Sequence, residues 1–286
     1  MVARTAGANL GLFAVGKRLI FVEGNDASID RLTYHKLAQT AFPDSYIMPI
    51  GSVENVIALR SVIDELSNAI FGIELFMIRD RDGLSDEIVS SLEKNPRFRC
   101  LRTPHVENYF LDEQVLLSVA EALYLPAEVR DLERIRLSLS EIAAKSLMPA
   151  VLWNTREYIR IIGAISQPTV RQVDQFSIDE LIDSISSQVE FSLSEIASTL
   201  DRNALDNAIR SEYARLESAL NSEAYKFLLP GKLIFKRFCG EFFRTEASRV
   251  REAYLDIAIK SKPDVVGDIT NILTSFASIA SSPNAS

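Results

Sequence analysis

The chain lacks the residues and patterns that define several large classes of protein. Its 286 residues include only two cysteines, Cys100 and Cys239, each alone in its neighbourhood. Two separated cysteines cannot build a disulfide framework or a four-cysteine zinc module, so we expect both to be small core residues. No apolar run approaches the roughly 20 residues of a membrane span, and the opening residues lack the basic-then-apolar layout of a signal peptide. We therefore expect a soluble, cytoplasmic protein.

An overall excess of basic residues is also missing. The net charge of −8 argues against a protein that coats nucleic acid, because backbone binding depends on lysine and arginine neutralising phosphates. Basic residues nonetheless gather late in the chain, at Lys226, Lys232, Lys236, Arg237, Arg244, Arg249 and Arg251. This cluster fits two interpretations: a phosphate-facing surface, or the solvated faces of helices in which acidic residues are interleaved.

The chain does contain a regular alternation of strand and helix signals in its first part. Short apolar runs predict strands at 19–22, 46–50, 73–78 and 98–101, and the segments between them carry apolar residues at helical spacing. Repeated strand–helix units with short turns predict an α/β fold, with a mostly parallel four-stranded sheet flanked by helices and with right-handed crossovers.

The remainder of the chain changes to an almost wholly helical pattern that prolines interrupt. One of the predicted helices runs over 233–260. We therefore expect two regions. Residues 1–117 would form the catalytic α/β domain, and residues 118–286 a mainly α-helical region for dimerisation or partner docking that also completes the site.

Two acidic turns each follow a predicted strand. Glu23 and Asp26 follow the first strand, and Asp80 and Asp82 follow the third. The carboxyl ends of parallel strands meet at one edge of a sheet, where ligands bind. Four carboxylates there would repel one another without a cation, and their hard oxygens suit Mg²⁺ or Mn²⁺ better than zinc. The pattern predicts a metal site for phosphoryl chemistry, with Asp80 and Asp82 on one side of an extended chain and Arg81 on the other.

The same residues carry a family resemblance. Residues 21–26 (FVEGND) and 78–82 (IRDRD) resemble the acidic motifs of the toprim domain, which topoisomerases, bacterial primases, small ribonucleases and OLD-family nucleases share. The resemblance covers about residues 17–117 and implies a Rossmann-like sheet. It also implies these metal ligands: Glu23, which is also a general acid or base, Asp26 of the OLD-like branch, Asp80 and Asp82.

Three further segments narrow the resemblance. Residues 51–56 (GSVENV) and 105–111 (HVENYFL) resemble a toprim-related family found beside ABC-type ATPases in bacterial defence islands, the AriB effectors of the PARIS anti-phage system. Residues 229–232 (LPGK) are similar to a glycine-lysine element of that family. By this resemblance Glu107 joins the metal site and Lys232 contacts the scissile phosphate, a role that suits its compact point charge.

Several of these residues also fit structural roles. Glu107 fits a helix-start residue favoured by the helix dipole, and Lys232 fits a plain helix start. His105 fits either a proton relay or a hydrogen-bonded structural residue, and Tyr109 fits a core aromatic better than a nucleophile. The candidate substrate-binding residues are Arg81, His105, Lys236 and Arg237.

The modules that this chain is expected to lack narrow the activities open to a toprim protein. Primases of this type bring a multi-cysteine zinc module, and topoisomerases need a further domain with a tyrosine nucleophile, and we expect neither here. The first hypothesis is a Mg²⁺-dependent endonuclease, a toxic anti-phage effector that acts as a homodimer. It would cleave RNA, tRNA above all, once released from a partner ABC-type ATPase. One alternative is a non-catalytic toprim-like scaffold whose helical region binds a partner and whose acidic cluster holds only a structural ion. The other is a phosphoryl-transfer enzyme for small molecules.

Overall fold

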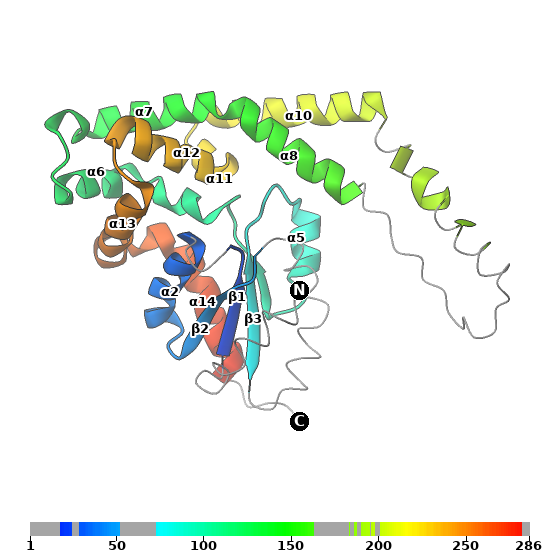
Figure 1. Cartoon of the computed structure of the whole chain (residues 1–286), viewed down its shortest axis with the longest axis horizontal. Coiled ribbons are helices and arrows are strands. Elements are labelled where there is room, and N and C mark those ends of the chain that lie inside the picture. The colour runs from blue at the N-terminus through cyan, green and yellow to red at the C-terminus, as the bar shows by residue number, and fades with distance from the viewer. Residues whose placement is uncertain are drawn as a thin grey trace. The chain divides into compact units, whose positions relative to one another are not determined.

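The computed structural model describes residues 18–24, 29–51, 73–162, 183, 186–187, 190–194, 196–197 and 201–281. The chain divides into two compact units, Met1–Ala144 with Lys226–Ser286 and Lys145–Tyr225. The first unit contains the sheet, and the second contains two long helices (Figure 1). Among the described residues, no helix combines the length and apolar character needed to cross a bilayer.

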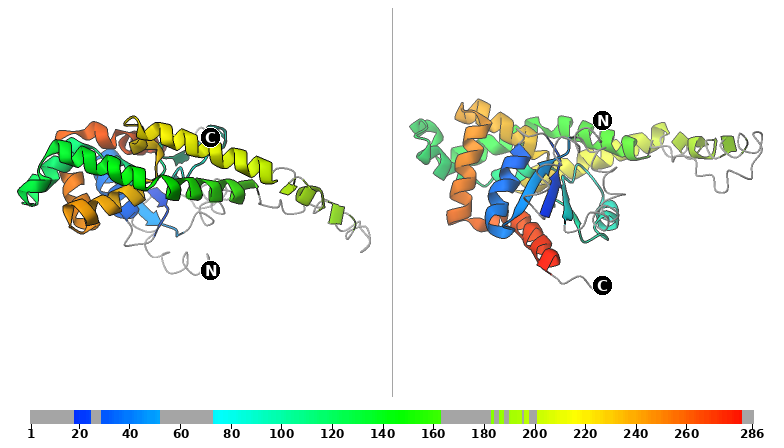
Figure 2. Two further views of the ribbon diagram at one scale, coloured as in Figure 1. Left: turned by 90° about the horizontal axis from the view of Figure 1, so that it is seen from above. Right: turned by 60° about the horizontal axis from the view of Figure 1, so that its bottom comes forward.

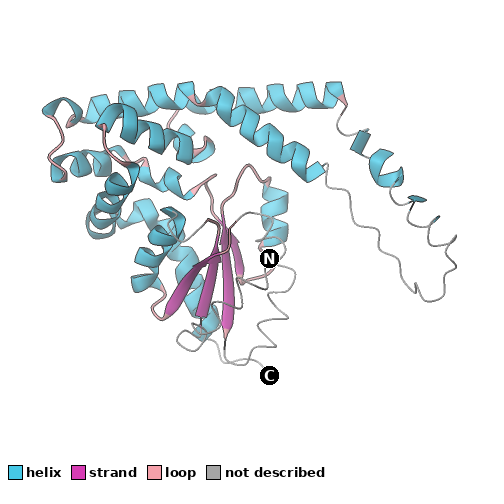
Figure 3. Ribbon diagram, in the orientation of Figure 1, coloured by secondary structure: helices cyan, strands magenta, loops and turns pink. Residues whose placement is uncertain are grey.

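The first unit contains a four-stranded sheet (Figure 3). Its strands are β1 (Arg18–Val22), β2 (Ser45–Pro49), β3 (Glu74–Arg79) and β4 (Phe98–Cys100). Their order is β2-β1-β3-β4, and every neighbouring pair is parallel. Strands buried on both faces are near-continuous apolar runs, which is why these segments stand out in the sequence. The predicted α/β fold with a parallel four-stranded sheet flanked by helices is confirmed.

One face of the sheet is covered by α2 (Ile29–Ala41) and α14 (Gly267–Ser281), which pack against each other. Phe76 of β3 stacks on Phe276 of α14 with ring centroids 4.7 Å apart. It also meets the ring of Phe42 edge-on at 5.6 Å. This aromatic contact joins two segments far apart in the chain.

The opposite face packs on α5 (Asp86–Leu92). Leu19 of β1 and Met77 of β3 share a buried cluster there with Leu92 of α5. Alternate residues of a strand point to opposite faces, so the neighbours of Leu19 and Met77 along their strands face α2 and α14 instead. The right-hand view of Figure 2 shows the sheet between these helices.

The remaining helices form the rest of the first unit or belong to the second unit. In chain order they are η2 (Val106–Phe110), α6 (Glu113–Ala122), η3 (Ala127–Val129), α7 (Leu132–Lys145), α8 (Leu147–Ile162), α10 (Arg202–Leu220), α11 (Tyr225–Leu228), α12 (Gly231–Arg237), η5 (Phe238–Phe243), α13 (Ala247–Ser261) and η6 (Pro263–Val266). In the second unit α8 packs against α10, and Asn154 donates a hydrogen bond to Glu212 at 2.6 Å.

The single helix predicted over 233–260 is wrong. The segment begins in α12, continues as one π-helical turn, η5, and then stops at Arg244, whose φ of 51° is left-handed. The Thr245 amide closes this end by donating to the carbonyl of Cys239 at 3.0 Å, and α13 follows. Apolar residues keep their spacing across the break, so periodicity does not reveal it.

The compact units also divide the chain differently from the predicted boundary after residue 117. The segment 226–286, which the sequence assigned to a helical region, belongs to the same unit as the sheet. The physical reason is apolar burial, since α14 covers a face that would otherwise expose Phe76. The helix signal between β2 and β3 lies outside the described residues.

The aromatic contact between sheet and α14 sets a stability prediction. Phe276→Ala should lower the free energy of unfolding by about 3–5 kcal/mol, because Phe276 is fully buried and truncation leaves a cavity against Phe76. Asn271→Ala, on the exposed side of the same helix, should change it by less than about 0.5 kcal/mol. Denaturant titration followed by circular dichroism measures both. Equal stability of the two variants would contradict the packing described.

Candidate functional site

The two acidic turns leave neighbouring strands at one edge of the sheet. β1 and β3 pair in parallel from Arg18 opposite Glu74 to Phe21 opposite Met77. Glu23 directly follows β1 and Asp80 directly follows β3, so both carboxylates lie at the same edge. The topology thus brings together the two strand ends that the sequence singled out.

A pair of glycines closes this edge on the β2 side. The amide of Gly24 donates to the carbonyl of Gly51 and the amide of Gly51 donates to the carbonyl of Gly24, both at 2.8 Å. Both residues have positive φ, 99° and 86°, a region where a Cβ would be strained. The bridge fixes the backbone immediately after Glu23 and explains why glycine follows each of these two strands.

Glu23 meets a buried cation that the sequence reasoning did not assign. The Nε of Arg79 lies 3.5 Å from Glu23 Oε1, and the exposed fractions of the two side chains are 4% and 15%. The parallel register explains the contact, since continuing the pairing by two residues sets Glu23 opposite Arg79. A buried guanidinium needs a carboxylate partner, so Arg79 both compensates and orients Glu23. The sequence signal that could have revealed this contact is an arginine, Arg79, directly before Asp80.

The second acidic turn is not extended as predicted. Asp82 has a φ of 44° and Gly83 a φ of 75°, and the Leu84 amide donates to the Arg81 carbonyl at 2.8 Å. This is a tight turn with two left-handed residues, so the prediction that both aspartates share one side of an extended chain is wrong. The turn buries Asp82, whose amide donates to the carbonyl of Pro104 at 3.2 Å.

Arg81 is engaged within this turn. Its Nε donates to the carbonyl of Leu84 at 3.2 Å, and its Nη2 forms an ion pair with Asp86 in the first turn of α5. These contacts join the turn to the helix that follows. A role for Arg81 in binding substrate stays a prediction.

His105 lies against the buried aspartate. Its Nε2 is 3.3 Å from Asp82 Oδ1, and the exposed fractions of the two side chains are 4% and 11%. Burial, and after it the positive charge of Lys232, lowers the pKa of His105 to about 4. The imidazole is therefore neutral at neutral pH.

The predicted ligand Glu107 is buried within η2, two residues after His105. Asp26, also predicted as a ligand, lies outside the described residues. Over the ranges that are described, no three histidine, cysteine, aspartate or glutamate side chains gather closely enough to hold a metal ion. The magnesium site stays a prediction.

Asn108 is the residue of this loop that the sequence reasoning missed. Its Oδ1 accepts from the amides of His105 at 3.0 Å and Gly231 at 3.1 Å, and its Nδ2 donates to the carbonyls of Lys226 and Leu229, both at 2.8 Å. The side chain joins the loop after β4 to the start of α12. No pattern in the sequence marks a contact between positions so far apart.

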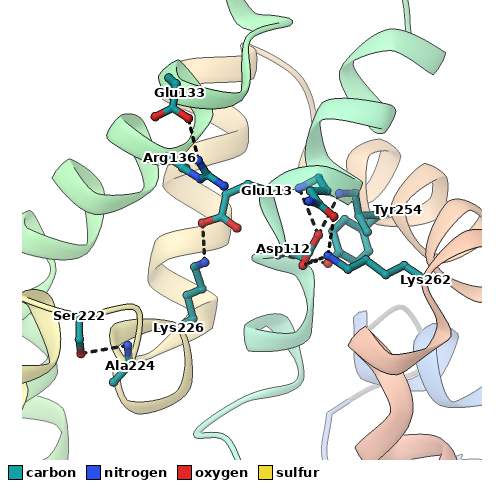
Figure 4. Close-up of polar contacts among 11 residues, drawn as sticks. Asp112, Glu113, Glu133, Arg136, Ser222, Ala224, Lys226, Tyr254 and Lys262 are labelled. Atoms are coloured by element: carbon teal, nitrogen blue, oxygen red, sulfur yellow. Dashed lines mark hydrogen bonds and ion pairs between the residues drawn. The ribbon is translucent and has the colours of Figure 1, made fainter.

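The basic residues of α12 divide by exposure. Lys232 and Lys236 are exposed and lie four residues apart, on one face of the helix, and Arg237 is half-buried. Lys226, by contrast, forms a buried ion pair with Glu113 (Figure 4). Lys226 is thus a structural member of the basic cluster, and Lys232 and Lys236 are free to face solvent.

The start of α6 is held by a second polar group (Figure 4). Asp112 caps this helix, and its Oδ2 accepts from Lys262 Nζ at 2.7 Å. The Asp112 amide donates to the hydroxyl of Tyr254 on α13 at 3.2 Å. These contacts fix the end of the loop that carries His105.

Tyr109 anchors the same loop to α14. Its hydroxyl donates to Asp268, which also pairs with Arg102 Nε at 3.1 Å. Burial, with the nearby Asp268 charge as the next cause, raises the pKa of Tyr109 above its ordinary value. A buried, protonated phenol is a packing residue and not a nucleophile.

Neither family models, curated proteins nor solved structures give a match to this chain. What is shown is an α/β unit with four parallel strands and an acidic edge. The toprim interpretation therefore depends on the motif resemblance and on the geometry of that edge.

The cysteines give a chemical test of the core beneath the site. Burial raises the pKa of both Cys100 and Cys239 to about 12. At pH 8 this lowers the reactive thiolate fraction about a thousandfold relative to an ordinary thiol. Ellman's reagent should label neither cysteine in the native protein and both in guanidinium. Rapid native labelling, assigned with Cys100→Ser and Cys239→Ser, would contradict the burial.

Proposed function

We propose that this chain is a Mg²⁺-dependent toprim endonuclease that hydrolyses phosphodiester bonds in RNA, with tRNA as the leading substrate. One observation carries the proposal. Because β1 and β3 pair in parallel, the acidic segments that follow them lie side by side at the carboxyl edge of the sheet. The loop after β4 packs next to these segments. That edge is where open α/β sheets bind ligands.

By their chemistry, the proposed donors fit a hard divalent cation. Glu23, Asp80, Asp82 and Glu107 would supply carboxylate oxygens, with Asp26 as a further donor, and such oxygens suit Mg²⁺ or Mn²⁺. When bound, the metal supplies activation of water and neutralisation of charge on the phosphate.

The remaining residues supply positioning and charge. Arg79 orients Glu23 from the buried side, so the carboxylate keeps one direction at the strand end. Neutral His105 contacts the Asp82 carboxylate and orients it. Lys232 presents a compact positive charge for a phosphate oxygen, and Lys236 continues that charge along the same helix face.

Restraint by a partner belongs to the same proposal. A nuclease that attacks the host's own RNA must be held inactive, and we assign that role to an ABC-type ATPase of an anti-phage defence system, with release to an active homodimer. Met148 and Leu152 of α8 are exposed apolar side chains on one helix face in the second unit, which suits a docking surface.

Cleavage assays test the nuclease proposal. Purified protein with Mg²⁺ should cut tRNA, and EDTA should abolish the cutting. Glu23→Gln and Asp80→Asn should each lower kcat about a hundredfold or more, equivalent to about 2.7 kcal/mol of transition-state stabilisation. Single-stranded DNA and plasmid, assayed in parallel, identify the substrate class.

Glu74→Gln is the matched control, because Glu74 is a carboxylate at the opposite end of β3, paired with Arg18. It should retain the wild-type kcat. Full activity of Glu23→Gln, or cleavage that ignores EDTA, would refute the metal-dependent mechanism.

A second candidate function has one observation in its favour. The guanidinium of Arg79 compensates the charge of Glu23, which also suits a non-catalytic toprim-like scaffold. For a scaffold, Glu23→Gln should destabilise the fold by leaving a buried guanidinium without its charge partner, yet wild-type protein should give no metal-dependent product on any substrate. Cleavage separates the two, since the acidic cluster of a scaffold would hold only a structural ion.

A further inference from the structure

We infer that Asn108 is a positioning residue that fixes the start of α12, and with it Lys232, beside His105 and Asp82. The kinetic part of this inference depends on the proposed nuclease function and deepens it. The structural part, a lock between the loop after β4 and α12, stands independently of any reaction.

The hydrogen-bonding capacity of Asn108 is fully used. A side-chain amide has two acceptor sites on oxygen and two donors on nitrogen. The oxygen accepts from His105 and Gly231 amides at 3.0 and 3.1 Å, and the nitrogen donates to Lys226 and Leu229 carbonyls at 2.8 Å each. The side chain is buried, so removing it deletes four buried hydrogen bonds at once. Aspartate would lose both donors, and leucine all four bonds.

Gly231 is the counterpart of Asn108. A Cβ at this position would lie 2.4 Å from the Asn108 backbone nitrogen and 2.5 Å from its Cγ and Oδ1. These distances are shorter than any non-bonded carbon contact, so only glycine allows the approach. Position 231 must therefore be glycine to leave space for the Asn108 side chain.

The pair sets the place of Lys232. One oxygen atom of Asn108 holds the amides of both His105 and Gly231, so the two backbone segments meet at a single acceptor. Lys232 is the next residue after Gly231, and His105 contacts Asp82. The lock therefore sets the distance between the lysine and the acidic edge.

Apolar packing alone would not set this distance. Behind the lock, Phe110 of η2 packs on Phe235 of α12, with ring centroids 5.3 Å apart. Such contacts are non-directional and tolerate a shift of the helix. A buried asparagine with four bonds does not tolerate it, because any shift breaks several hydrogen bonds at once. Asn108 thus specifies the register of α12 against the loop.

Gly231→Ala tests the inference because it forces a methyl group against Asn108, and Gly240→Ala is the matched control. A Cβ at Gly240 meets nothing within 4 Å, although this glycine lies in the helical segment that continues α12. Gly231→Ala should lower kcat on tRNA at least about tenfold with little change in KM, since Lys232 acts on the transition state. Gly240→Ala should keep the wild-type kcat.

A double-mutant cycle separates positioning from general damage. Lys232→Met should lower kcat by itself, and in that background Gly231→Ala should cause no further loss, because the lysine it displaces is already absent. If the wild type cleaves tRNA and Gly231→Ala keeps full kcat, or loses as much in both backgrounds, the positioning role is overturned and the nuclease proposal survives.

Amide hydrogen exchange gives a readout that needs no activity. The amides of His105 and of residue 231 should be protected in the wild type and in Gly240→Ala, and both should exchange at least about tenfold faster in Gly231→Ala. Unchanged protection of the His105 amide in Gly231→Ala would overturn the lock. If the wild type cleaves nothing, the proposed function fails, and hydrogen exchange still decides whether Asn108 joins the two segments.

Discussion

The parallel pairing of β1 with β3 is the contact on which the site depends. Because of this pairing, the acidic turns that follow the two strands lie at the same edge of the sheet. It also sets Glu23 opposite Arg79, so that a buried guanidinium compensates the carboxylate. A shift of one residue in this register would turn every side chain of one strand to the other face. The apolar residues on both faces of the sheet therefore hold the electrostatic arrangement at its edge.

The second requirement is that distant chain segments return to the sheet. α14 covers one face through Phe276, and α12 reaches the loop after β4 through Asn108 and Gly231. The two contacts act differently. The aromatic contact buries apolar surface, whereas the hydrogen bonds of Asn108 fix the register of α12 against the loop. Together they make the site a product of two parts of the chain that are separated by the whole second unit.

Local patterns in the sequence predicted the local parts of this arrangement. The four strands, the acidic residues at their ends and the α/β class follow from apolar runs and from the topology of parallel sheets. The left-handed turn at Asp82 escaped prediction because an aspartate before glycine fits several backbone conformations. The break at Arg244 escaped because its neighbours keep helical spacing. The Arg79 and Asn108 contacts depend on tertiary register, which no single-sequence pattern carries.

The place of α14 in the chain has a consequence for synthesis on the ribosome. Phe76 and Phe276 stack on each other, yet 200 residues separate them in the sequence. At about 5–20 residues per second, translation of that interval takes roughly 10 to 40 seconds. Until that interval has been translated, Phe276 is not there to cover Phe76.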